Sequence, residues 1–217
     1  MKRIISSIFI IALVLCGCSA TAQYEPEEFI NISDKMHEPV MRIYYQYPEY
    51  PAGCELASCC QLLRYYGYNT NIDDLLYTYL PVSDSEWVNS YYGDIYTGGF
   101  AFPQAIHKAL QDYLTDNNSH LRVENISKCS WEEYLGYLQR EIPVITWYTI
   151  DYEEPNLSDE TMGGYQVWWN LHCIVTYKID DEYIYIADPI EGYTVQDIEY
   201  FKTIWEKCGS YAVTVIP

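Results

Sequence analysis

Apolar residues recur at intervals of three and four between residues 54 and 66, where Leu56, Cys60 and Leu63 would share one face of a helix. Gly67 follows as a C-terminal cap, because glycine readily adopts the left-handed backbone that ends many helices. Similar patterns predict helices at residues 73–79, 103–114 and 130–140. The last of these begins with a capping box, in which Ser130 is the N-cap and Glu133 follows three residues later.

Strands are predicted where β-branched and aromatic residues dominate, at residues 142–150, 167–179, 183–187 and 211–216. The second and third of these strands form a hairpin with its turn at Asp180–Asp181. Because the helices come first and the strands later, the sequence predicts an α+β fold with an antiparallel sheet.

Residues 1–17 have the pattern of a secretory signal. Lys2 and Arg3 precede an apolar run from Ile4 to Leu15, which is too short to span a bilayer. The run ends in Leu15-Cys16-Gly17-Cys18, which resembles a bacterial lipobox. We therefore expect Cys18 to be lipidated and to become the first residue of the mature chain.

Cleavage after Ala20-Thr21-Ala22 is the alternative, and it would leave the protein secreted instead of anchored. Both interpretations place the working domain outside the cytoplasm. The expected organisation is a signal at residues 1–17, a polar tether and lead-in at 18–40, and one domain at 41–217.

The composition excludes intrinsic disorder, since 49% of the residues are hydrophobic and 17% are aromatic. Twelve Lys and Arg stand against thirty-one Asp and Glu, which argues against a nucleic-acid partner. Without residues 1–17 the formal charge changes from −19 to −21 (10 minus 31). A basic patch is therefore not what holds the chain to an anionic membrane, and any membrane contact must come from the lipid.

Motifs for several classes of enzyme are missing. The sequence has no HExxH, no pair of CxxC motifs, no Walker loop and no GxSxG, so no cofactor or metal is expected. The acidic stretch at residues 151–160 could hold calcium, but it lacks the ligand order and the central glycine of an EF-hand.

Cys54 is the leading candidate for a nucleophile. It follows Pro51-Ala52-Gly53 and opens the first predicted helix, where the helix dipole and unpaired N–H groups favour a thiolate. A thiolate is the nucleophile of cysteine hydrolases. The alternative is that Cys54 is buried without a catalytic role, or is part of a disulfide.

His172 is the leading candidate for the base, because it stands within an apolar strand where an imidazole needs a partner. His37 and His120 are expected at the surface, and His107 on a helix. If the hairpin turns near Asp180–Asp181, opposed residues have numbers that sum to about 360–362, so Asp188 is expected opposite His172 within one residue. A carboxylate there could orient the imidazole, although a purely structural His–Asp pair is the alternative.

Five stretches carry a family resemblance: PAGCELASCCQLLRYYG, GGFAFPQAIHKAL, WEEYLGYLQREIPVITW, HCIVTYKIDDEYIYIADPIEG and FKTIWEKCGSYAVTVI. Together with Gln46 they resemble the papain-like cysteine peptidases of the double-glycine (bacteriocin leader) peptidase superfamily, specifically the stand-alone family thirty-nine-like domains. The resemblance implies a papain-like α+β fold in which the helix bearing the cysteine packs against an antiparallel sheet.

The resemblance also implies roles for individual residues. Cys54 matches the nucleophile, His172 the general base and acid, and Asp188 the orienting carboxylate. Gln46 matches a glutamine that stabilises the oxyanion together with the backbone N–H of Cys54. The implied activity is cleavage of a peptide or protein substrate by a lipid-anchored extracytoplasmic enzyme.

Two other functions remain open. A transferase or deamidase of the same fold would use the same residues with a different acceptor, and a non-catalytic surface-binding lipoprotein would use the fold without the chemistry. The disulfide pairing of the remaining cysteines is not predicted; these are Cys59, Cys60, Cys129, Cys173 and Cys208.

Overall fold

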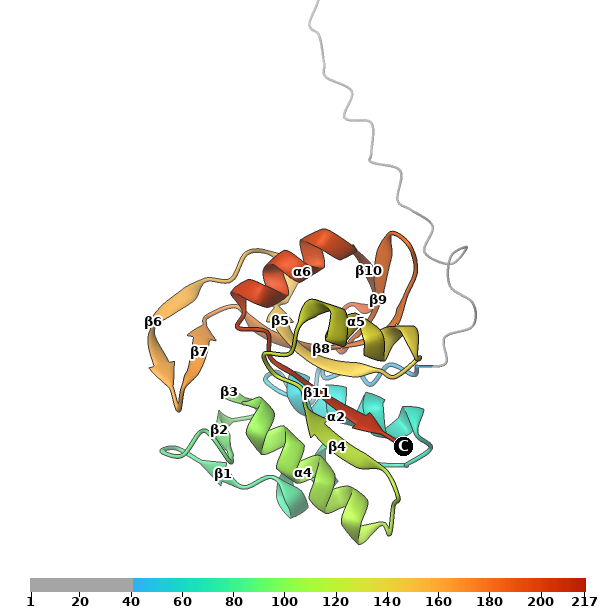
Figure 1. Ribbon diagram of the computed structural model, residues 1–217. Helices are drawn as coiled ribbons and strands as arrows, with labels where there is room; N and C mark the ends of the chain where they lie inside the picture. Colours follow the sequence, from blue (N-terminus) through green and yellow to red (C-terminus); the bar gives the residue numbers. More distant parts are fainter. Residues whose placement is uncertain (1–40) are drawn as a thin grey trace, which may run out of the picture. The chain divides into compact units, whose positions relative to one another are not determined.

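A six-stranded antiparallel sheet forms the core of the computed structural model, which describes residues 41–217 (Figure 1). Its strand order is β10-β9-β8-β5-β11-β4. The strands are β4 (Arg122–Asn125), β5 (Val144–Thr149), β8 (Leu171–Ile179), β9 (Tyr183–Asp188), β10 (Gly192–Asp197) and β11 (Ala212–Ile216). The expected signal, Cys18 and the tether lie outside the described residues.

Helices cover both faces of this sheet, and β5 shows why. Successive side chains of a strand point to opposite faces, so Thr146 and Trp147 face different layers. Thr146 hydrogen-bonds to the Tyr134 hydroxyl of α5 (Trp131–Gln139) at 2.7 Å, whereas the Trp147 indole donates to the Ala101 carbonyl at 2.9 Å on the other side. All six residues of β5 are consequently buried.

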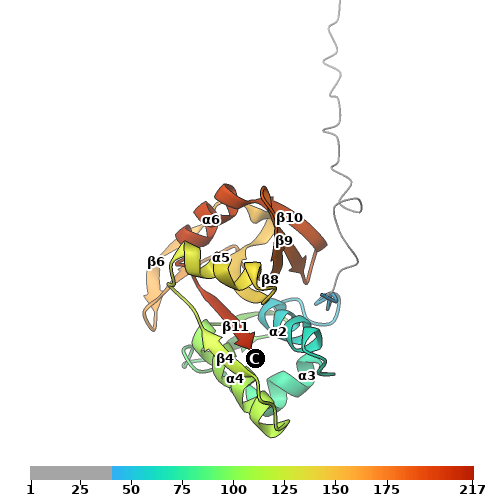
Figure 2. The ribbon, with the colours of Figure 1, turned by 45° about the vertical axis from the view of Figure 1, so that its right-hand side comes forward.

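The helix α6 (Ile198–Lys207) joins α5 on the first face, where the Phe201 ring stacks on Tyr148 with centroids 4.8 Å apart. The helix α2 (Cys54–Tyr65) packs against β8 and β5 from the other face, as Figures 1 and 2 show together. The helix α4 (Pro103–Asp116) packs along β4 and β11. The site residues of β8 therefore lie where the sheet meets the first turn of α2.

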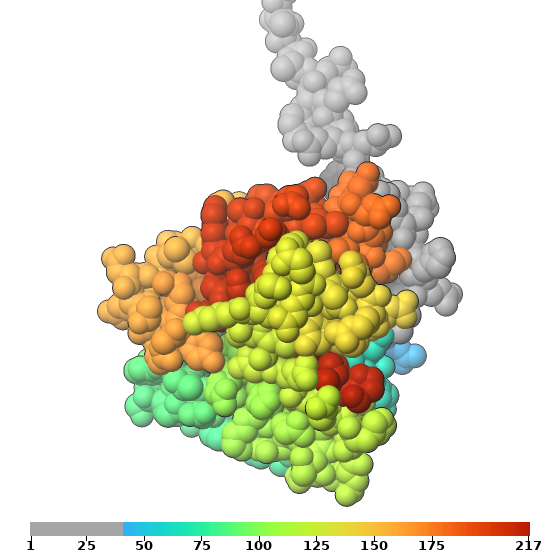
Figure 3. Space-filling view, viewed as in Figure 1, coloured from blue at the N-terminus to red at the C-terminus, as the bar shows by residue number. Residues whose placement is uncertain are grey.

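Two smaller sheets lie to one side of the main sheet (Figure 1). One consists of β1 (Val82–Ser83), β2 (Tyr91–Asp94) and β3 (Gly98–Ala101), and the other is the hairpin of β6 (Leu157–Met162) and β7 (Tyr165–Trp168). Tyr165 stacks on Phe102, which follows β3, with ring centroids 4.3 Å apart. Figure 3 shows the hairpin beside the β1–β3 sheet on the surface.

Short helical segments complete the chain. They are α3 (Ile72–Asp74), the π-helix η1 (Leu75–Tyr79) and the 3-10 turn η2 (Ile150–Tyr152). None of the helices within residues 41–217 has the length and apolar character that crossing a bilayer requires. The cysteines of the same range are all free thiols, so it contains no disulfide framework.

The predicted fold class is confirmed: the fold is α+β, and the main sheet is antiparallel throughout. The helix predicted at 54–66 is α2, and the Ser130 hydroxyl caps α5 by accepting the Glu133 N–H at 3.1 Å. The strand predicted at 167–179 is wrong as one element, because a turn at Trp169–Asn170 separates β7 from β8. The segment predicted as one helix at 73–79 is divided between α3 and η1.

Candidate active site

Cys54 is the first residue of α2, and a tight turn directly precedes it. The N–H of Gly53 donates to the Tyr50 carbonyl at 2.9 Å, and a Cβ on Gly53 would lie only 2.8 Å from the Tyr50 Cβ. Only glycine fits this close approach. Because an N–H in the first helical turn has no partner within the helix, that of Cys54 is available to an external acceptor.

The Cys54 side chain is buried against β8, with 7% of the residue exposed. Burial, followed by the charge and hydrogen bond of Glu55, raises the pKa of the Cys54 thiol, while a backbone hydrogen bond from Cys173 acts in the opposite direction. The helix N-terminus was expected to favour the thiolate, but here burial and the neighbouring carboxylate outweigh it. A positive partner is therefore needed before the thiolate can form.

His172 lines the same cleft from the start of β8. Its Nε2 lies 3.0 Å from Asp188 Oδ1 at the end of β9, and both side chains are almost completely buried. Since Nε2 is occupied by the carboxylate, Nδ1 is the ring nitrogen left for another partner. This is the arrangement in which a carboxylate fixes the tautomer of an imidazole base.

Asp188 is held by further donors. The Tyr152 hydroxyl donates to Oδ2 at 2.7 Å, and the backbone N–H groups of Ile190 and Glu191 donate to Oδ1 at 2.6 and 3.1 Å. Burial acts to raise the pKa of Asp188, but the hydrogen bonds and charge of His172, together with Tyr152 and Ile190, lower it below its ordinary value. Asp188 is thus kept as a carboxylate beside the imidazole.

The strand register lies at the upper end of the expected range, which offsets Asp188 from His172 by two residues instead of at most one. Near the site, Val175 lies opposite Ala187, so opposed residue numbers sum to 362, and the sum rises to 363 after a bulge between Thr176 and Lys178. Asp188 therefore meets His172 diagonally and not directly across. The two side chains still share a face, because positions two apart on a strand point the same way.

Gln46 lines the same cleft as Cys54 and precedes the turn that leads into α2. Its backbone N–H donates to the Pro189 carbonyl at 3.0 Å, and its Nε2 donates to the Pro51 carbonyl at 2.8 Å. A side-chain amide has two N–H groups, so one remains for another acceptor. Gln46 Oε1 is buried and has no hydrogen-bond partner.

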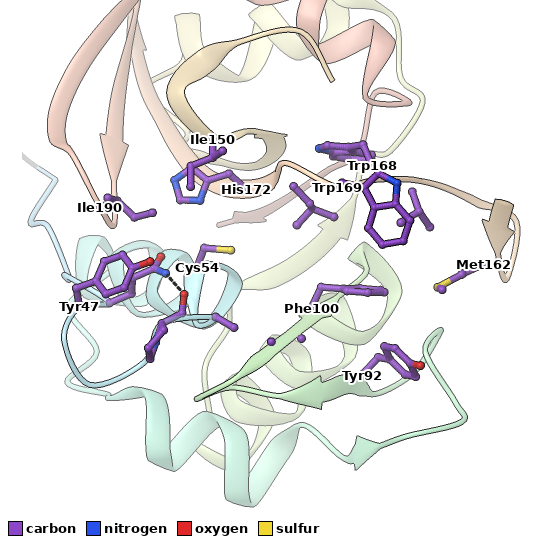
Figure 4. Close-up of a pocket in the computed structure, with 17 residues that line it drawn as sticks. Tyr47, Cys54, Tyr92, Phe100, Ile150, Met162, Trp168, Trp169, His172 and Ile190 are labelled. Carbon is purple, nitrogen blue, oxygen red and sulfur yellow. Dashed lines mark hydrogen bonds between the residues drawn. The ribbon is translucent and has the colours of Figure 1, made fainter. Parts of the chain in front are cut away.

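Gln46, Cys54 and His172 line one cleft with a volume of about 560 Å³. In Figure 4, Cys54 lies at the floor with His172 above it, Tyr47 lies to one side, and Phe100 and Trp168 extend to the other. The lining consists of Gln46, Tyr47, Pro51, Ala52, Cys54, Tyr92, Gly98, Gly99, Phe100, Ile150, Met162, Val167, Trp168, Trp169, Leu171, His172 and Ile190. A buried thiol and an oriented imidazole thus share a groove that is open to an extended ligand.

Two polar residues near the site were not predicted from the sequence. Glu55 is fully buried beside Cys54, where its Oε2 lies 3.3 Å from the sulfur. Tyr152 reaches Asp188 from η2 with a positive φ of 62°. An acidic residue in the first turn of a helix is ordinary, and nothing in the local sequence marks Tyr152.

The chain is similar to known proteins in sequence and in fold. Residues 40–213 match the model of the Peptidase_C39 like family. The crystal structure of a C39-like peptidase from Bacillus anthracis is similar, with a TM-score of 0.71 and 21% identity over 82% of this chain and 94% of that one.

The peptidase domain of Streptococcus ComA, described as a bi-functional ABC transporter, matches with a TM-score of 0.50 and 16% identity over 82% of this chain and 98% of that domain. At such low sequence identity, the two structural similarities show a shared fold and nothing more. No curated protein matches the sequence. The family match spans almost all of the described residues, and it places the chain in the Peptidase_C39 like family of cysteine peptidases.

Proposed function

We propose that this protein is an extracytoplasmic peptidase that hydrolyses peptide bonds with Cys54 as nucleophile, His172 as base and acid, and Asp188 as the orienting carboxylate. The observation that carries the proposal is the buried His172–Asp188 pair at 3.0 Å, whose histidine lines the same cleft as Cys54. Because Asp188 binds Nε2, we assign Nδ1 to the thiol.

In the proposed reaction, His172 Nδ1 accepts the thiol proton, and the resulting thiolate attacks the carbonyl carbon of the substrate. The imidazolium, stabilised by Asp188, then donates this proton to the leaving amine. A water molecule, deprotonated by His172, hydrolyses the thioester. This step releases the acid product and restores the thiol.

Gln46 and the backbone N–H of Cys54 supply the two donors for the oxyanion. Gln46 uses one amide hydrogen to bind the Pro51 carbonyl, which holds the side chain in place, and the second is left for the substrate. Donors fixed before the reaction stabilise developing charge without a cost of reorganisation.

The proposed location rests on residues 1–18. A lipid on Cys18 would hold the mature chain at the outer face of the bacterial membrane, with residues 18–40 as the tether. We expect Cys18→Ala to move the protein from the membrane pellet to the soluble fraction. Retention in the pellet after detergent-free ultracentrifugation would contradict lipid anchoring.

Hydrolysis of fluorogenic casein tests the reaction. Cys54→Ala and His172→Ala should each abolish turnover, and Asp188→Asn should reduce kcat by roughly 100-fold, because the imidazolium loses its negative partner. Cys129→Ala is the matched control, since this partly exposed thiol lies outside the cleft and its loss should leave kcat unchanged.

Undiminished hydrolysis by Cys54→Ala would contradict the peptidase proposal. Product masses separate the chemistries: new amino and carboxyl termini indicate hydrolysis, whereas a transferred acyl group indicates a transferase. Release of ammonia from an intact chain indicates a deamidase. Binding without any product indicates a surface-binding lipoprotein.

A further inference from the structure

Glu55 is a buried carboxyl group that the proposed mechanism does not use. It follows the nucleophile on α2, and its exposed fraction is 0%. Its Oε1 accepts the backbone N–H of Ala101 at 3.1 Å, and its Oε2 lies 3.3 Å from Cys54 Sγ. The carboxyl group therefore links the reacting sulfur directly to strand β3.

Several ionisable groups face Glu55 from the elements packed around it. They are Cys54 and Cys59 on α2, Tyr91 on β2, and His172 and Cys173 on β8. His172 is the only one of these groups that can become positively charged. Burial raises the pKa of Glu55 to about 7, against the hydrogen bonds of Ala101 and Cys54 and the charge of His172, which lower it.

Either Cys54 or Glu55 can be the donor in the hydrogen bond between them. When Glu55 is ionised, the thiol donates its only hydrogen to Oε2, which lies 3.3 Å from the sulfur. When Glu55 is neutral, Oε2 carries a proton and can donate it to the sulfur instead. The thiol cannot give the same hydrogen to Glu55 and to His172 at once, so the two directions correspond to different states of the nucleophile.

We propose that Glu55 controls whether Cys54 is reactive: as a neutral acid it donates a hydrogen bond to the thiolate, and as a carboxylate it holds the thiol proton away from His172. The inference rests on the proposed function, because it assigns a second proton-bearing partner to the same nucleophile. Glu55 touches the reacting atom, so it belongs to the catalytic centre.

The two states differ by one proton. The unreactive state holds a Glu55 carboxylate, a Cys54 thiol and a neutral His172. Uptake of one proton from solvent by Glu55, together with transfer of the thiol proton to His172 Nδ1, gives a neutral acid, a thiolate and an imidazolium. The reactive state is thus favoured below about pH 7 and is lost as the pH rises and Glu55 ionises.

The rate of Cys54 alkylation by iodoacetamide measures the thiolate, and it can be followed in the full chain by mass spectrometry of the Cys54 peptide. In the wild type we expect the rate constant to fall about tenfold between about pH 6 and about pH 8, as the neutral acid is depleted tenfold for each pH unit above its pKa. Glu55→Gln should show no such fall. The amide keeps an acceptor for Ala101 and a donor for the sulfur at every pH.

Glu132→Gln, an exposed carboxylate on α5, is the matched control and should retain the wild-type profile. The proposal is overturned if Glu55→Gln shows the same profile as the wild type, or if the wild-type rate rises steadily from about pH 6 to about pH 8, as for an ordinary thiol.

A second measurement does not depend on the folding of a variant. The ¹³C signal of the Glu55 carboxyl group should titrate between about pH 6 and about pH 8 in the wild-type protein, and titration below about pH 5 would overturn the proposal. Failure of the proposed function is distinguishable, because casein hydrolysis would then be absent, or would survive complete alkylation of Cys54, whatever the pH profile of alkylation.

Discussion

At the scale of single residues, the orientation of His172 depends on how firmly Asp188 is held. Within residues 41–217, Tyr152 is the only side chain besides His172 that hydrogen-bonds to this carboxylate, at 2.7 Å from Oδ2. Its φ of 62° is rare for a bulky residue. An uncommon backbone conformation thus aims the hydroxyl at Asp188, which is typical of strain at functional sites.

Replacing Tyr152 with Phe removes this donor and keeps the ring. A hydrogen bond to a charged group contributes about 1.5–3 kcal/mol, so we expect kcat for casein hydrolysis to fall at least about tenfold, with KM unchanged. Tyr137→Phe is the matched control, because its hydroxyl also binds a carboxylate, Glu124, at 2.8 Å, outside the cleft. An equal fall in kcat in both variants, or a change in KM alone, would show that Tyr152 does not position Asp188.

The sequence identified the residues of the site that carry a pattern, and missed those that do not. Cys54 stands at a helix start and His172 within an apolar strand, so both are marked by local context. Glu55 resembles an ordinary acidic residue of a first helical turn. Its inward direction depends on β3 lying next to α2, which is tertiary information.

At the scale of elements, the position of α2 against the sheet sets the distance from nucleophile to base. The Ser58 hydroxyl donates to the Cys173 carbonyl at 3.1 Å, and the Gln61 amide donates to the Ala187 carbonyl at 3.4 Å. These acceptors directly neighbour His172 and Asp188 in the chain. The helix is therefore attached to the two strands at the positions that carry the base and its carboxylate.

Gly53→Ala tests whether the tight turn before α2 requires a glycine. The added methyl would lie 2.8 Å from the Tyr50 Cβ and 3.1 Å from its carbonyl oxygen, so the turn between Gln46 and Cys54 must shift. We expect kcat to fall at least about tenfold, since small displacements of a nucleophile cost large factors in rate.

Gly136→Ala is the control for Gly53→Ala. Gly136 lies on α5 with nothing within 4 Å of its Cβ position, so alanine should stabilise the helix by about 0.5–1 kcal/mol and leave kcat unchanged. Wild-type kcat in a folded Gly53→Ala protein would contradict the requirement for this turn.

Helices and strands were predicted correctly where the sequence has a single clear periodicity. The prediction failed where a turn interrupts an apolar run. Trp169 appeared to continue a strand, yet it is 74% exposed, because the Asn170 side chain accepts the Asn156 N–H at 2.8 Å and stabilises a turn there. The helix α6 was missed although Phe201, Ile204 and Trp205 have helical spacing and are buried. The β1–β3 sheet, which contains paired glycines, offers no strong strand pattern.

At the scale of the whole molecule, the acidic character of the chain does not extend into the cleft. The formal charge is −19, yet none of the residues lining the cleft is Asp, Glu, Lys or Arg. The lining comes from segments far apart in the sequence, including β3, β7 and β8, so composition could not reveal it. An apolar groove beside Cys54 favours apolar side chains of a substrate.

This surface predicts which peptides are cut fastest. Burying a large apolar side chain contributes about 1.5–3 kcal/mol, so peptides with Phe or Leu beside the scissile bond should have kcat/KM values roughly 10- to 100-fold above matched peptides with Glu. Phe100→Ala should lower this ratio of kcat/KM values, because it removes a large apolar side chain from the cleft wall. Tyr77→Ala should leave the ratio unchanged, because Tyr77 is 68% exposed and does not line the cleft. If acidic peptides were cut as fast as apolar ones, the lining would not select the substrate, and recognition would have to occur on the surface outside the cleft.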